Sequence, residues 1–266
     1  MDFFTTKDWL NREPPYAFKL DHILFVIIGL LVGIGIAFLL RKKDKKTVKT
    51  TLIAMWAFAV LLEVVYYGTE YILCIKHPNE HPFVLEGMLP FHSCSMFMYV
   101  FPVAMFVRNK YIKTAASNFL VVVNMIMGFI TLFVGCPPKG SAALSFGGVQ
   151  SITYHILIVV VPLIMLITNY YDIKKEDIKY GLACFGTLAI TMWVFDAIAH
   201  CDYFYFYDGR TFGVLYVISE HVPHIVWTLI VVTCYVLTAL IIHYSVIGIK
   251  CWIEKKKNNN TVATNE

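Results

Sequence analysis

Residues 23–49 read ILFVIIGLLVGIGIAFLLRKKDKKTVK, an apolar run that ends in a dense cluster of positive charge. A helix needs roughly 20 mostly apolar residues to cross about 30 Å of hydrocarbon, so this run is typical of a transmembrane helix. Six of the nine residues from Arg41 to Lys49 are Lys or Arg, which is typical of a segment on the cytoplasmic side of a membrane. The stretch therefore predicts a membrane-spanning fold.

The composition of the whole chain agrees with this prediction. Of its 266 residues, 58% are hydrophobic and only 15% are charged, whereas a soluble domain carries about 25% charged residues. We predict an all-α fold, a polytopic membrane bundle of seven transmembrane helices. The seven apolar segments are residues 23–40, 51–73, 89–107, 112–135, 151–170, 180–200 and 218–247.

The distribution of positive charge predicts the orientation. The segments that follow spans one, three, five and seven hold 16 of the 22 Lys and Arg residues. We predict a protein of the cell membrane. The positive-inside rule then puts its amino terminus outside and its carboxyl terminus in the cytoplasm. We expect an extracytoplasmic segment at 1–22, a membrane domain at 23–250 and a basic, polar tail at 251–266, disordered from Glu254. The net charge of +4 follows from this basic rim and indicates no nucleic-acid partner.

Ionisable side chains within the spans mark the candidate site, because such residues are costly in a bilayer and usually face a cavity. Glu63 lies near the middle of span two. His92, His155 and His224 lie in the outer halves of spans three, five and seven, and Cys94 follows His92 by two residues. These five residues are our candidate catalytic group.

Their chemistry suggests an enzyme that acts on lipid acyl groups, by transfer or by hydrolysis. A thiolate can attack an acyl carbonyl once a nearby base takes its proton. Cys94 would be the nucleophile, His155 or His92 the general base, and Glu63 would orient a histidine. Two residues are about 200° apart on a helix, so His92 is the less natural base for Cys94, and His155 or His224 on another helix could take this role. An inert buried thiol and structural histidines are the alternatives.

Two other functions are open on the sequence alone. A metal-dependent hydrolase could use Asp196, His200, His221 and His224 as zinc ligands. Asp196 and His200 are four residues apart, as are Glu220 and His224, so each pair would share a helix face. A transporter or small-molecule binder would use Glu63 and the histidines as a relay. The acyl-group hypothesis requires no cofactor.

Small residues predict one close helix contact. Gly29 and Gly33 are four residues apart in the first span. This spacing lets the backbones of two membrane helices approach each other closely. We expect these glycines to serve packing within the bundle.

Two short motifs resemble a known family. Residues 89–95, LPFHSCS, resemble the Leu-Pro-x-His-x-Cys signature of the YwaF-like bacterial integral membrane proteins. Tyr154-His155, followed by Pro162, resembles a His-to-Pro span that those proteins share with the eukaryotic transmembrane protein 164 family. The resemblance implies the same multi-span fold along nearly the whole chain, with membrane lipids as partners.

The eukaryotic relatives imply phospholipid acyl transfer, in which a Cys directly before the span-three His carries the acyl group. By this match His92 and His155 keep their roles. The position before His92 is Phe91 here, so the Cys does not carry over. Cys94 would replace it only if the chain presents this thiol to the same cavity.

Overall fold

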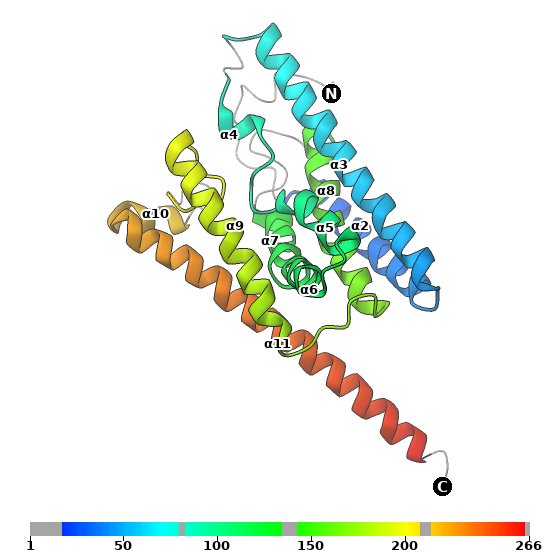
Figure 1. Cartoon of the computed structure of the whole chain (residues 1–266). Coiled ribbons are helices and arrows are strands. Elements are labelled where there is room, and N and C mark those ends of the chain that lie inside the picture. The colour runs from blue at the N-terminus through cyan, green and yellow to red at the C-terminus, as the bar shows by residue number, and fades with distance from the viewer. Residues whose placement is uncertain (1–17, 80–82, 135–142, 208–213, 264–266) are drawn as a thin grey trace.

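The computed structural model describes residues 18–79, 83–134, 143–207 and 214–263, and every regular element in them is a helix. The helices cross one another in a bundle, from which the carboxyl-terminal half of the last helix projects (Figure 1). Residues 1–17, which make up most of the predicted segment 1–22, lie outside the described part of the chain, as does the end of the predicted fourth span at residue 135.

Six helices of the described chain are long and apolar enough to cross a membrane. They overlap the predicted spans one, two, four, five, six and seven, so the all-α membrane fold is confirmed. The seven-span count and the orientation remain predictions. The helices are α2 (Leu20–Leu40), α3 (Lys45–Lys76), α6 (Lys110–Phe119) with η1 (Leu120–Asn124) and α7 (Met125–Val134), α8 (Phe146–Ile167), α9 (Asp177–Ala199) and α11 (His224–Ala263).

The third predicted span is not one helix. After the short helix α4 (Leu85–Met88), residues 89–95 are irregular, and only α5 (Met96–Phe106) is helical. Its 11 residues extend about 16 Å, about half the hydrocarbon thickness. Pro90 disfavours helix in the residue before it and cannot donate a backbone hydrogen bond. His92 and Cys94 therefore lie in an irregular segment, and the 200° argument for their separation on a helix does not apply.

The start of the seventh predicted span is also broken. Helix α10 (Val214–His221) ends before Pro223, and α11 begins at His224. Glu220 and His224 are therefore on different helices, and the prediction that they share a face is wrong. At its other end α11 continues to Ala263, so the disorder predicted from Glu254 is wrong for the described part of the tail.

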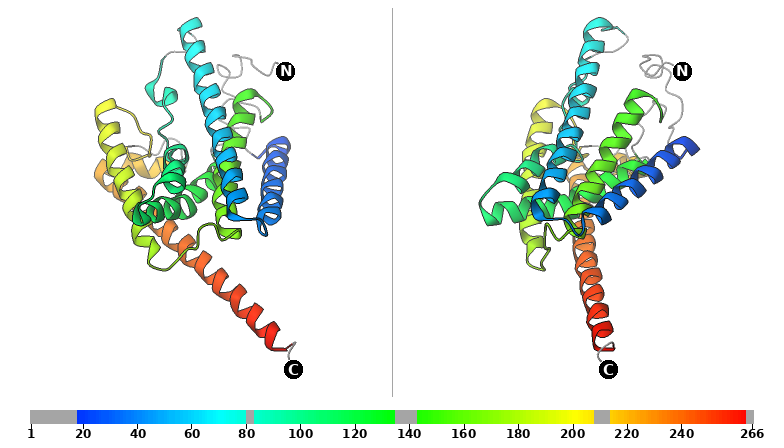
Figure 2. Two further views of the ribbon diagram at one scale, coloured as in Figure 1. Left: turned by 45° about the vertical axis from the view of Figure 1, so that its right-hand side comes forward. Right: turned by 90° about the vertical axis from the view of Figure 1, so that its right-hand side faces the viewer.

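Helix α8 forms the centre of the bundle and packs against α2, α3 and α7 (Figure 2). A Cβ atom added at Gly29 would collide with Ile156 of α8, and one added at Gly33 would collide with Val160. The predicted role of these glycines is confirmed, because they let α2 lie against the most buried helix of the bundle. A further close contact joins Gly128 of α7 to α8.

The basic connections join neighbouring helices. Asp44 caps α3, where its carboxylate accepts hydrogen bonds from the backbone N–H groups of Lys46 and Thr47 at 2.9 and 3.0 Å. The Lys49 ammonium lies 5.4 Å from the centre of the Phe106 ring, at the end of α5. Lys250 of α11 forms an ion pair with Asp172, which lies between α8 and α9. The positive segments thus take part in packing.

Candidate functional site

The irregular segment 89–95 is held inside the bundle by one amide. Asn124 Nδ2 donates hydrogen bonds to the backbone carbonyl oxygens of Ser93, at 3.3 Å, and Cys94, at 3.1 Å. Asn124 is fully buried and belongs to the π-helical turn η1. Non-helical backbone is tolerated at membrane depth only where the protein satisfies its polar groups, and π-helical turns are frequent at functional sites.

A buried carboxylate lies beside this segment. Gln150 Nε2 of α8 donates a 2.6 Å hydrogen bond to Glu63 Oε1 of α3, and both side chains are buried. Glu63 is close enough to interact electrostatically with the half-buried Cys94 thiol. The hydrogen-bond partner of Glu63 is therefore Gln150, whereas we had expected a histidine.

His155 has the geometry of a base. Its Nδ1–H donates to the Ser151 carbonyl oxygen at 2.7 Å. A carbonyl oxygen can only accept, so in the neutral ring Nε2 carries the lone pair. His155 is buried and close enough to His92 to interact with it electrostatically. The structure therefore brings together two of the three candidate histidines.

An aromatic loop, residues 201–207, covers His92. The His92 ring packs edge-on against Tyr203 with centroids 5.1 Å apart and stacks on Tyr205 at 6.1 Å. Asp196 at the end of α9 accepts a 3.0 Å hydrogen bond from the Tyr203 N–H, and Trp227 Nε1 of α11 donates to the Tyr205 carbonyl oxygen at 3.0 Å. The aromatic loop is thereby tied to α9 and α11.

The four candidate zinc ligands are not assembled. Asp196 is engaged by the aromatic loop, and His200, with φ of 53°, ends α9 in a left-handed conformation, so the two do not share a helix face as predicted. His221 ends α10, while His224 is exposed and stacks on Tyr207 at 4.3 Å. No three His, Cys, Asp or Glu side chains among the residues described are grouped to hold a metal ion.

Several buried polar atoms surround the irregular segment. Asn124 Oδ1 has no hydrogen-bond partner among the described residues. The Tyr154 hydroxyl lies beside Ser95, and the Tyr235 hydroxyl lies beside Ser93. An unpaired buried polar group costs about 1–3 kcal/mol, and such groups are usually satisfied by water or a ligand. A polar group of a bound molecule would find its partners here.

Sequence reasoning did not assign roles to three of these residues. Gln150 stood in a predicted outer loop, although it is a buried residue in the first turns of α8. Asn124 was a polar residue in an apolar span, which was a usable signal, but its partners were not predictable without the fold. Tyr235 gave no signal, because tyrosine is common at the edges of membrane helices.

Comparison with known proteins supplies the family. The model of the TMEM164 family matches residues 17–244, which is most of the chain. The chain belongs to the TMEM164 family. The TMEM164 match includes Glu63, Cys94, His155 and the whole aromatic loop, and it ends within α11. No curated protein and no solved structure matches the chain. The narrower likeness to YwaF-like bacterial proteins remains a prediction.

Proposed function

We propose that this TMEM164 family protein is a membrane enzyme that transfers or hydrolyses the acyl groups of lipids, with Cys94 as its nucleophile. One observation carries the proposal. Asn124 holds the irregular segment 89–95 so that Cys94 lies near Glu63 while His92 lies near His155. The thiol beside a carboxylate and the two neighbouring imidazoles support a reactive site at this irregular segment.

The first half of the reaction forms a thioester. His155 Nε2 takes the proton of the Cys94 thiol, and the thiolate attacks the carbonyl carbon of a lipid ester. The ester C–O bond breaks, and the leaving alkoxide of the lysolipid takes the proton from the imidazolium.

The second half releases the acyl group. A hydroxyl of an acceptor lipid, or of water, gives its proton to His155 and attacks the thioester carbonyl. The C–S bond breaks, and the thiolate recovers the proton from the imidazolium. An acceptor lipid gives net acyl transfer and water gives hydrolysis, while the enzyme returns to its starting state in both cases.

The surroundings of the site suit a lipid substrate. Large apolar side chains are exposed along α2, α3, α9 and α11, where a bilayer would contact them. A lipid can therefore approach the bundle without leaving the hydrocarbon. Asn124 Oδ1, beside Cys94, supplies a polar partner for the ester or the acceptor hydroxyl.

The test uses full-length protein in nanodiscs of phosphatidylcholine with an isotope-labelled acyl chain, with lysophosphatidylcholine as the acceptor. Mass spectrometry measures labelled product lipid, free labelled fatty acid and any acyl adduct on Cys94. We expect Cys94→Ala to abolish both products, and His155→Ala to slow them by about 100-fold or more. Cys184→Ala, which removes a half-buried thiol of α9, is the matched control and should keep full activity.

Two results would contradict the proposal. Wild-type protein that gives no more product than empty nanodiscs would exclude these acyl lipids as substrates. Cys94→Ala protein with wild-type activity would exclude the thioester. In the wild-type protein, hydroxylamine-sensitive acylation of Cys94 without acylation of Cys184 would support the covalent step directly.

A further inference from the structure

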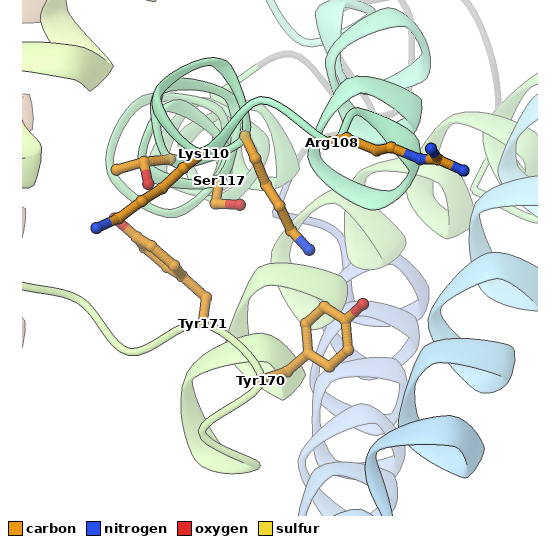
Figure 3. Close-up of a pocket in the computed structure, with 7 residues that line it drawn as sticks. Arg108, Lys110, Ser117, Tyr170 and Tyr171 are labelled. Atoms are coloured by element: carbon orange, nitrogen blue, oxygen red, sulfur yellow. The ribbon is translucent and has the colours of Figure 1, made fainter.

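A pocket of about 250 Å³ lies between the start of α6 and the chain that follows α8 (Figure 3). Arg108 and Lys110 lie on one side of it, and Tyr170 and Tyr171 lie across from them (Figure 3). One face of α6 supplies Lys110, Lys113 and Ser117, which follow one another at intervals of three and four residues. One helix thus presents both cations and hydroxyls to the pocket.

The charge of this lining has one sign. Arg108, Lys110 and Lys113 all line the pocket, and no Asp or Glu does. Within the described ranges, none of the three forms an ion pair, in contrast to Lys250, which pairs with Asp172. A concave surface lined by like charges concentrates counter-ions of opposite sign. The pocket is therefore suited to an anion.

The hydroxyl groups complete the arrangement. Thr114, Ser117 and Tyr170 each provide a hydroxyl in the lining. Ser117 is buried, while Lys113 and Thr114 are half-buried, so part of the lining is shielded from solvent. Cationic and hydroxyl donors together match an oxyanion with several acceptor oxygens.

The far wall is rigid. The Tyr171 hydroxyl accepts a hydrogen bond from Asn118 Nδ2 at 3.2 Å and donates one to Asp177 Oδ2 at 2.8 Å. Asn118 also contacts His243 Nδ1 of α11 at 3.1 Å. Tyr171 is therefore fixed between α6, α9 and α11, and its ring forms a fixed wall.

Recognition would come from side chains rather than from the end of the helix. Asn109 Oδ1 accepts hydrogen bonds from the backbone N–H groups of Tyr111 and Ile112, so these first donors of α6 are already used. Arg108 can bind two oxygens of one phosphate through its planar guanidinium, and the lysines act as mobile point charges. A tetrahedral anion fits this donor set better than a single carboxylate does.

We propose that this pocket binds a phosphate group, carried by a lipid headgroup or by a soluble phosphate ester. The binding does not depend on the chemistry of Cys94. Ser117 of the pocket and Asn124, which holds Cys94, are seven residues apart on one continuous helix, or about 10 Å. A phosphate in the pocket would therefore lie within the length of one lipid molecule from the irregular segment.

The test measures binding to the purified full-length protein in detergent. The probes are inorganic phosphate, glycerol 3-phosphate, dihexanoyl phosphatidic acid and, as the uncharged match, dihexanoylglycerol. We expect the phosphate-bearing probes to bind more tightly than dihexanoylglycerol, and Lys110→Gln/Lys113→Gln to weaken them by about tenfold or more. Lys42→Gln/Lys43→Gln makes the same charge change at exposed residues between α2 and α3, outside the pocket, and should bind as the wild type does.

The pattern across probes separates the two sources. Phosphatidic acid that binds at least tenfold more tightly than glycerol 3-phosphate supports a lipid headgroup, and equal binding supports a soluble ester. Equal loss in both double variants, or no preference for phosphate over dihexanoylglycerol, would overturn the proposal. Arg108→Gln is the second variant: if thermal unfolding shows that the pocket double variant is misfolded, this single change should still weaken phosphate binding.

Discussion

The Gln150 amide of α8 donates a 2.6 Å hydrogen bond to the Glu63 carboxylate of α3, between two helices of the bundle. Both side chains are buried, so neither can readily exchange this partner for water. The bond ties together the two helices on either side of it, close to the Cys94 thiol.

Glu63→Ala should therefore destabilise the protein by about 1–3 kcal/mol, because Gln150 loses its acceptor in a buried place. Glu63→Gln should stay close to the wild type, because its side-chain oxygen still accepts the bond. Unfolding of the purified protein in mixed micelles, followed by circular dichroism, measures both. Equal stability of Glu63→Ala and the wild type would show that the bond does not stabilise the fold.

Asn124→Ala should loosen the irregular segment. The carbonyl oxygens of Ser93 and Cys94 would lose their donor, so we expect a loss of about 1–3 kcal/mol and faster alkylation of Cys94. Peptide mass spectrometry after a timed maleimide reaction gives the rate for each cysteine separately. Cys184, on α9, is the internal control, and its rate should not change. A Cys94 rate equal to that of the wild type would contradict the role of Asn124.

Gly33→Ala should destabilise the contact between α2 and α8, because the new Cβ would collide with Val160. Overpacking of this kind costs about 1–3 kcal/mol. Gly35→Ala is the matched control two residues away, where an added Cβ meets nothing within 4 Å. This control should be neutral or gain up to about 1 kcal/mol of helix propensity. The double variant Gly33→Ala/Val160→Ala should recover part of the loss, and a Gly33→Ala protein as stable as Gly35→Ala would refute the contact.

The stability that Asp44 gives to the start of α3 should depend on pH. Hydrogen bonds from the Thr47 side chain and backbone lower the pKa of Asp44 below its usual 3.8. A carboxylate with a lowered pKa stabilises the fold above its unfolded pKa, and this contribution disappears as the pH falls through the folded pKa. The stability advantage of wild type over Asp44→Ala should thus be full at pH 6 and shrink below pH 3.8. Parallel thermal unfolding curves across that range test this, and a pH-independent difference would be the contrary result.

Hydropathy alone predicted most of the helices. The long apolar runs at 23–40 and 151–170 correspond to α2 and α8, and Gly29 and Gly33 even indicated a close contact between helices. The error at residues 89–95 has a physical cause. A hydropathy window averages over Pro90, Ser93 and Ser95, whereas whether a helix forms there depends on donors such as Asn124 that come from another part of the chain.

The sequence also indicated some of the candidate site residues. The rarity of ionisable groups in apolar spans pointed to Glu63, His92 and His155, and their shared role in one site stays a prediction. The pairings of Asp196 with His200 and of Glu220 with His224 assumed continuous helices. Both fail because a helix ends within each pair, at His200 and before Pro223. Local breaks of this kind are decided by tertiary contacts, which spacing along the chain does not contain.

Helix α11 has 40 residues and extends for about 60 Å, about twice the thickness of the bilayer hydrocarbon. Its first turn holds the aromatic loop through Trp227, and its far end carries Lys255 and Lys256. One uninterrupted helix therefore joins the contact with the loop whose rings lie over His92 to a basic cluster at the other end of α11.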